Sequence, residues 1–136
     1  MANRRKGREL ALQALYQIDI LGRNDEESLV LLYESFYPRE ERNSFSDELI
    51  MGVLANLAEI DAMIEKYSEN WKLSRMPAVD RNVLRLAVFE LLHKEDIPVK
   101  VTMNEAIEIG KRYGSENTGS FVNGILDKIA KTVKKD

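Results

Sequence analysis

The stretch VDRNVLRLAVFELLH, residues 79–93, decides the fold class, because as a helix it is apolar around almost its whole circumference. A helix on the surface of a globular protein carries one apolar stripe, whereas a helix that is apolar on most sides is buried by its neighbours. Pro77 precedes the stretch and Pro98 follows it, so both ends carry helix-breaking signals. The sequence therefore predicts a central buried helix around which other elements pack.

The segments on both sides of this stretch also show helical spacing of apolar residues rather than alternation. We expect helices over about 5–21, 25–37, 45–71 (with or without a break), 102–114 and 118–133. Thr102 and Glu105 have the spacing of a capping box, which would start the helix at about 102–114. Six or seven helices with short connections make an all-α bundle. We expect one domain over 1–136, with an N-terminal sub-bundle at about 4–72 and a C-terminal sub-bundle at about 78–134.

Composition argues against most enzyme classes. Cysteine is absent and His93 is the single histidine, which argues against disulfides, thiol chemistry and the common zinc sites. There is no glycine-rich phosphate loop, GxSxG or HExxH motif. No apolar run approaches the roughly 20 residues that span a bilayer, and no secretory signal is evident. We therefore expect a cytoplasmic protein without catalytic residues, metal or cofactor.

Basic residues gather at the N-terminus of a chain whose formal net charge is −3. Arg4, Arg5, Lys6 and Arg8 all precede the first acidic residue, Glu9. Such a cluster can bind phosphates through counterion release. The alternative is a solubilising terminal tail, since short basic termini are common.

The first predicted helix has a face that an apolar core does not explain. Its core stripe consists of Leu10, Ala11, Ala14, Leu15, Ile18 and Leu21. At about 100° per residue, Arg5, Arg8, Leu12 and Tyr16 fall together on the opposite side. Guanidinium groups beside an exposed ring suit single-stranded nucleic acid, where arginine neutralises phosphate and the ring stacks on a base. A solvated face with an incidental tyrosine is the alternative.

The last predicted helix has a similar feature. Phe121 lies off the stripe formed by Val122, Ile125, Leu126, Ile129, Ala130 and Val133, on the same side as Lys128. The ring could stack on a base, or it could staple the helix start to the preceding loop. That loop carries amides and hydroxyls, and the amides of a helix N-terminus can receive a phosphate.

Four segments resemble the NusB family of bacterial transcription antitermination factors. They are RRKGRELALQALY at 4–16, the central stretch at 79–92, VTMNEAIE at 101–108 and FVNGILD at 121–127. Each segment alone is only a helical pattern, but the four in this order and at these separations are specific. The resemblance covers about Arg4 to Ala130.

This resemblance implies two three-helix bundles packed side by side. It also implies binding of boxA, a short single-stranded element of nascent ribosomal RNA leader transcripts, together with NusE, the free form of a small-subunit ribosomal protein. The complex would join an RNA polymerase assembly that resists premature termination. The sequence leaves open whether the free protein is a monomer or a homodimer. We expect no membrane partner.

The family pattern also implies site residues. The implied RNA contacts are Arg4, Arg5, Lys6, Arg8, Tyr16, Glu116, Asn117, Thr118, Gly119, Ser120, Phe121 and Lys128. Ser120 departs from the pattern, because many relatives have lysine there. The implied partner surface is the central helix with its flanks, namely Asp80, Arg81 and Arg85. We expect Asp80 to be exposed at the helix start and to make the main ionic contact.

Two other functions compete with this interpretation. One is a helical adaptor that binds only proteins and carries a basic tail. The other is kinship with the N-terminal domain of ribosomal RNA cytosine methyltransferases. The methyltransferase alternative needs a downstream catalytic domain, for which a chain of 136 residues leaves no room.

Overall fold

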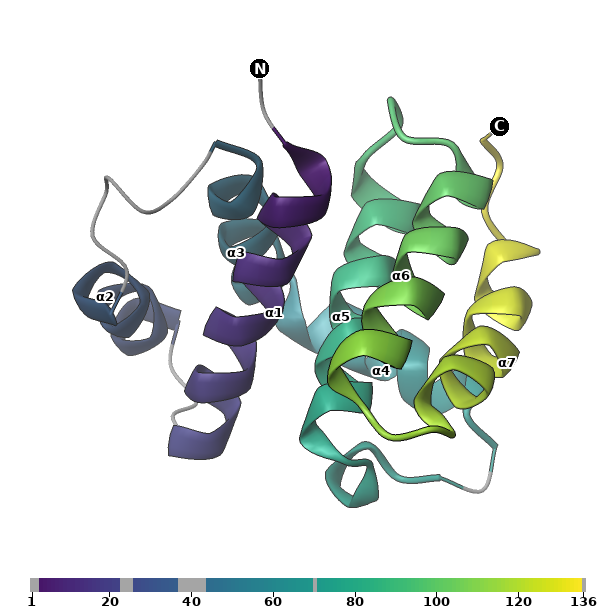
Figure 1. The fold of residues 1–136 in the computed structure, drawn as a ribbon, viewed down its shortest axis with the longest axis horizontal. Helices are drawn as coiled ribbons and strands as arrows, with labels where there is room; N and C mark the ends of the chain where they lie inside the picture. The colour runs from purple at the N-terminus through teal and green to yellow at the C-terminus, as the bar shows by residue number, and fades with distance from the viewer. Residues whose placement is uncertain (1–2, 23–25, 37–43, 70, 136) are drawn as a thin grey trace.

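The computed structural model describes residues 3–22, 26–36, 44–69 and 71–135. These residues contain seven α-helices, a 3-10 turn over Leu73–Arg75 and no strand, which confirms the all-α fold class (Figure 1). The helices are α1 (Arg4–Leu21), α2 (Glu26–Phe36), α3 (Ser44–Ala55), α4 (Leu57–Tyr67), α5 (Ala78–His93), α6 (Val99–Tyr113) and α7 (Thr118–Ala130).

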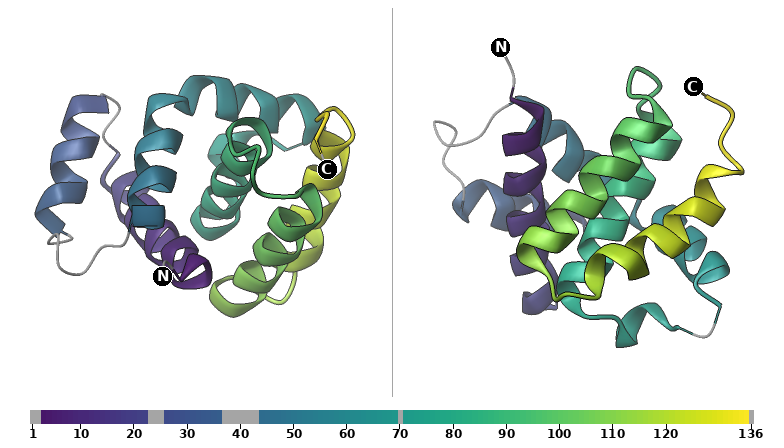
Figure 2. Two further views of the ribbon diagram at one scale, coloured as in Figure 1. Left: turned by 90° about the horizontal axis from the view of Figure 1, so that it is seen from above. Right: turned by 45° about the vertical axis from the view of Figure 1, so that its right-hand side comes forward.

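Helix α5 is the central element, as its apolar circumference predicts. It packs against α1 and α3 on one side and against α6 and α7 on the other, with α4 across the back (Figures 1 and 2). Its buried apolar residues are Val83, Leu84, Leu86, Ala87, Val88, Phe89 and Leu91. Burying this surface supplies hydrophobic stabilisation to both halves of the molecule, because it is shared between them.

Helices α1, α2 and α3 pack on one another, and α5, α6 and α7 form the second bundle. Helix α4 follows α3 after a break at Asn56, whose side-chain amide donates to the carbonyl of Gly52 at 2.8 Å. After this turn α4 packs against α5 and α7. The long apolar segment therefore forms two helices that cover different parts of the core, and Trp71 lies beyond the second.

Two glycines determine where α1 ends and how closely α3 approaches α5. Helix α1 ends at Gly22, which adopts the left-handed conformation with φ of 70° that glycine tolerates best. Gly52 lets α3 approach α5, because a Cβ at this position would lie 2.1 Å from the ring of Phe89.

The capping box predicted at Thr102 is wrong. Helix α6 begins three residues earlier, at Val99, and its N-cap is Pro98. Thr102 lies inside the first turns, where its hydroxyl donates to the Glu90 carboxylate of α5 at 2.8 Å. Glu105 accepts hydrogen bonds from Arg5. Both residues thus contact neighbouring helices rather than the backbone of their own helix.

Candidate nucleic-acid interface

Three of the four basic residues at the N-terminus are exposed, on the first turn of α1. This turn is held by Asn3, whose side chain accepts the backbone N–H of Lys6 at 2.9 Å. Arg4 pairs with Asp96 at 3.0 Å, and Arg5 pairs with Glu105 at 2.6 Å. In the described part of the chain Lys6 has no acidic partner. Two of the three exposed cations are therefore already engaged with carboxylates.

These pairs shift the titration of the groups involved. The hydrogen bond from Arg5 holds the pKa of Glu105 below its ordinary value, and the same bond raises the pKa of Arg5. The hydrogen bond from Arg4 likewise lowers the pKa of Asp96. Both carboxylates are therefore ionised at neutral pH. A phosphate that binds Arg4 or Arg5 competes with a carboxylate for the guanidinium, whereas a phosphate at Lys6 has no such competitor among the described residues.

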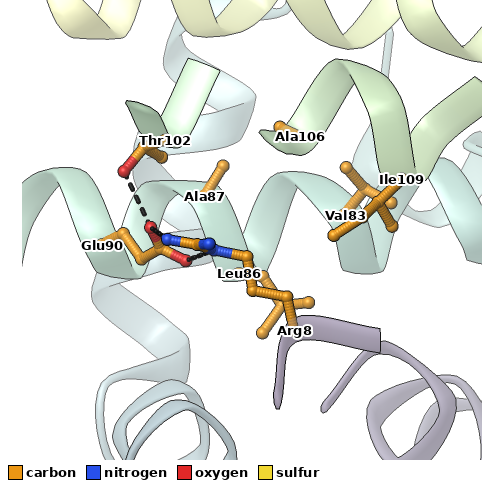
Figure 3. A pocket seen from close by; sticks show the side chains of 8 residues that line it. All are labelled: Arg8, Val83, Leu86, Ala87, Glu90, Thr102, Ala106 and Ile109. Atoms are coloured by element: carbon orange, nitrogen blue, oxygen red, sulfur yellow. Dashed lines mark hydrogen bonds and ion pairs between the residues drawn. The ribbon is translucent and has the colours of Figure 1, made fainter. Parts of the chain in front are cut away.

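Arg8 does not lie on an exposed face, contrary to the prediction. Only 4% of its surface is exposed, and its guanidinium makes a bidentate pair with the buried Glu90, at 2.7 and 2.9 Å. Figure 3 shows this pair, with Thr102 donating to the same carboxylate. The ring of Phe45 lies 5.2 Å from the guanidinium. Arg8 therefore links α1 to α5 inside the protein and is not available to a phosphate.

The reason for this error is that α1 has two buried faces. It packs against α3 on one side and α5 on the other. Leu12, which shares the face of Arg8, is 3% exposed. A helical wheel identified the first buried face only, because the second contains a charged residue whose partner lies 82 positions away.

Tyr16 is exposed, as predicted, and it lines a groove of about 420 Å³. The other lining residues are Leu12, Gln13, Gln17, Val79 and Tyr113. Tyr113 is the last residue of α6 and faces this groove together with Tyr16. The sequence analysis missed Tyr113. Its position directly before the loop to Phe121 was the one available signal.

The loop before α7 has an inward and an outward side. Thr118 and Gly119 are buried, and the Thr118 hydroxyl donates to the Asp80 carboxylate at 2.8 Å while accepting the N–H of Ser115. Glu116, Asn117 and Ser120 are exposed. The inward residues therefore fix the loop against α5, and the outward residues offer polar groups to a ligand.

Phe121 is half-buried, and its partner is Trp71 of the α4–α5 connection. The two ring centroids are 5.6 Å apart at an interplanar angle of 75°. The contact that partly covers Phe121 thus involves a segment distant in sequence. Lys128 is exposed and pairs with Glu69 at 2.7 Å, a hydrogen bond that lowers the pKa of Glu69.

The expectation that Asp80 is exposed is wrong, because it is 7% exposed and bonded to Thr118. Its neighbours on α5 also have partners. Arg81 pairs with Asp19 at 2.7 Å, and Arg85 pairs with Asp61 at 2.8 Å. A shallow groove of about 470 Å³ lies beside this network, lined by Asp19, Glu65, Leu73, Ser74, Arg81 and Arg85.

The predicted RNA residues do not form one cluster. The N-terminus and the α6–α7 connection lie at opposite ends of the molecule (Figure 1). The groove of Tyr16 and Tyr113 lies between them, because α1 contributes one wall and the end of α6 contributes another. We use the word track for these features taken in order, from the cationic start of α1 through the groove of Tyr16 and Tyr113 to Phe121 at the start of α7.

Two kinds of feature are absent from the described residues. No helix there is both long and apolar enough to cross a membrane. Nor do the described His, Asp and Glu side chains form a group of three or more suited to a metal ion.

Comparisons with known proteins agree on one family. The NusB family model matches residues 5–131. The transcription antitermination protein NusB of Geobacter sp. (strain M21) is 50% identical and covers 98% of this chain and 97% of its own length. The structure of T. maritima NusB superposes with a TM-score of 0.79 at 46% identity, covering 96% of this chain and 92% of that one.

A solved structure of the antitermination factors NusB and NusE in complex with dsRNA also matches. Its TM-score is 0.77 at 31% identity, and the match covers 97% of this chain and 99% of that one. This chain belongs to the NusB family, because the family model matches most of the chain, the relative from Geobacter aligns over nearly its whole length and the fold is shared.

Proposed function

We propose that this chain is a transcription antitermination factor that binds the single-stranded boxA element of nascent ribosomal RNA together with NusE. The bound complex joins an RNA polymerase assembly and prevents premature termination. The role is a binding role in the cytoplasm and involves no catalysis. The observation that carries the proposal is the track from the cationic start of α1, through the groove of Tyr16 and Tyr113, to Phe121.

Each part of this track has a function in the proposed complex. Arg4, Arg5 and Lys6 neutralise phosphates at one end. Tyr16 and Tyr113 present rings to unpaired bases in a groove that is open to solvent. The exposed Asn117 and Ser120 donate to or accept from bases and phosphates. Arg8, Thr118 and Gly119 support the track from beneath, because they are buried.

We further propose that NusE docks beside the start of α5. The shallow groove there offers the charges of Asp19, Arg81 and Arg85 to a protein partner. Asp80 contributes indirectly in this arrangement, by holding Thr118 and the loop in place. The solved relative with NusE supports a protein partner in this family.

The decisive experiment measures fluorescence anisotropy of a labelled boxA RNA titrated with this chain, with and without NusE. We expect binding that NusE tightens, and much weaker binding of a scrambled RNA of equal length. Ser74→Arg places a larger side chain in the shallow groove and removes no hydrogen bond or ion pair of the described residues. It should reduce the gain in RNA affinity that NusE provides and leave RNA binding without NusE unchanged. Binding of NusE without binding of either RNA would favour the adaptor function instead, and equal affinity for both RNAs would contradict the boxA preference.

A further inference from the structure

Trp71 is the single tryptophan of the chain, and 49% of its surface is exposed. Exposing such a large aromatic residue sacrifices hydrophobic stabilisation that burial would supply. The indole N–H has no hydrogen-bond partner among the residues that the structure describes. Neither the sequence motifs nor the track described above assigns it a function.

Two hydrogen bonds tie the backbone of Trp71 to Ser68. The backbone N–H of Trp71 donates to the backbone carbonyl of Ser68 at 3.1 Å, and the Ser68 hydroxyl donates to the backbone carbonyl of Trp71 at 2.7 Å. Glu69 turns the chain at a φ of 51° and is tied to α7 by Lys128. The backbone of Trp71 is therefore anchored by hydrogen bonds while its ring stays exposed.

Phe121 is the aromatic neighbour of this ring. The two rings meet edge to face, so that at least one of them keeps both of its faces free of the other. Because Phe121 is half-buried and Trp71 is exposed, most of the accessible aromatic surface belongs to Trp71. The pair therefore continues the track past Phe121 onto the α4–α5 connection.

The charges beside Trp71 differ from those at the start of α1. Lys72 and Arg75 are exposed, and neither pairs with an acid in the described ranges. An exposed ring flanked by unpaired cations is the combination that stacks a base and neutralises its phosphate.

We propose that Trp71 stacks on a base of the bound single-stranded RNA, beyond the base that meets Phe121, while Lys72 and Arg75 neutralise the adjoining phosphates. This inference rests on the proposed RNA function. It extends the RNA path by one aromatic position, supplied by the segment between the two bundles.

Intrinsic fluorescence tests the stacking directly, since all tryptophan emission comes from Trp71. Titrating the full chain with boxA RNA should quench this emission and shield the ring from acrylamide. Trp71→Ala should weaken RNA binding by about 5- to 150-fold, and Trp71→Phe should retain most of the affinity. Val101→Ala, an exposed apolar position on α6, is the matched control and should bind like the wild type.

The outcomes separate this inference from the function on which it rests. If the wild type binds boxA RNA, but its emission and acrylamide access do not change and Trp71→Ala binds equally well, the stacking inference is wrong and the function stands. If the wild type does not bind boxA RNA with or without NusE, both are wrong. Should Trp71→Ala fail to fold, the wild-type quenching and shielding decide the question.

Discussion

The two ends of the proposed RNA track differ in what a ligand must displace. At the start of α1, Arg4 and Arg5 are paired with Asp96 and Glu105. At the other end, Trp71 exposes its ring, and Lys72 and Arg75 have no acidic partner within the described ranges. Phosphate binding at the first end exchanges one anion for another, whereas stacking at the second covers surface that water now covers.

This difference indicates that positive charge in the sequence overstates the charge available to RNA. Of the four clustered basic residues, Arg8 is buried, two are paired at the surface and Lys6 is unpaired. Exposed ion pairs contribute little to stability, so RNA can replace them at small cost. The buried pair has a structural role, and its loss has different consequences.

The largest expected effect comes from Arg8→Ala. This change leaves the Glu90 carboxylate buried without its cation, so the free energy of unfolding should fall by about 3–5 kcal/mol. Arg5→Ala, one turn away and exposed, should cost about 1 kcal/mol or less. Urea unfolding of both variants makes the comparison. Similar small losses would mean that Arg8 is not the internal link described above.

The second effect concerns Phe121→Ala. We expect it to cost about 1–3 kcal/mol of RNA binding through lost stacking. The loss of stability should be smaller, and below the 3–5 kcal/mol typical of a fully buried phenylalanine, because this ring is half-buried. RNA titrations and denaturant melts measure the two quantities.

The neighbouring Val122 is fully buried and provides the control for this position. Val122→Ala should lower stability while the folded protein keeps its RNA affinity. If Phe121→Ala shows that same pattern, a large drop in the unfolding midpoint with unchanged affinity, Phe121 is a core residue.

The third effect is a change in salt dependence. Each phosphate contact to single-stranded RNA contributes about −0.7 to the slope of log affinity against log salt. Replacing Arg4, Arg5 and Lys6 by alanine should therefore flatten the slope by about two units. The fold should remain intact, because all three side chains are exposed. An unaltered slope would show that RNA does not reach the start of α1.

The smallest effect is on acid stability through Glu105. Its pKa is lowered in the folded protein by Arg5, from an ordinary value of about 4.5. The stabilisation is therefore present above that value and is lost as the pH falls through the lower, folded pKa. Glu105→Gln should remove this part of the acid dependence, at a cost of less than about 1 kcal/mol at neutral pH. The test is to measure the urea midpoint of both proteins at intervals of about one pH unit between pH 3 and 7. If Glu105→Gln loses stability at low pH as steeply as the wild type does, Glu105 is not the source of this acid dependence.

Several features of the fold follow from local rules. Gly22 predicted the end of α1, and the apolar circumference of 79–93 predicted the central helix. Tyr16 was placed correctly because it lies on neither buried face of α1. These features depend on residues close together in the chain.

Local rules mislead where a partner distant in sequence decides whether a side chain is buried. The helical wheel predicts an exposed Arg8, and the position at a helix start predicts an exposed Asp80, but Glu90 and Thr118 provide buried partners. Thr102 was assigned to a cap because its hydroxyl could reach the backbone, and Glu90 binds it instead. Tyr113 was missed because its partner across the groove, Tyr16, is far away in sequence.

The sequence by itself determined the helices, the central position of 79–93 and the family, because apolar period, helix-ending residues and ordered motifs are local properties. The tertiary structure alone decided which polar side chains face water. A charged group is buried only where an opposite charge or a hydrogen-bond donor compensates the loss of hydration, as Glu90 does for Arg8 and Thr118 does for Asp80. That compensation depends on helices meeting in space. For the same reason, only the packed structure shows that Trp71 lies beside Phe121 at the aromatic end of the track.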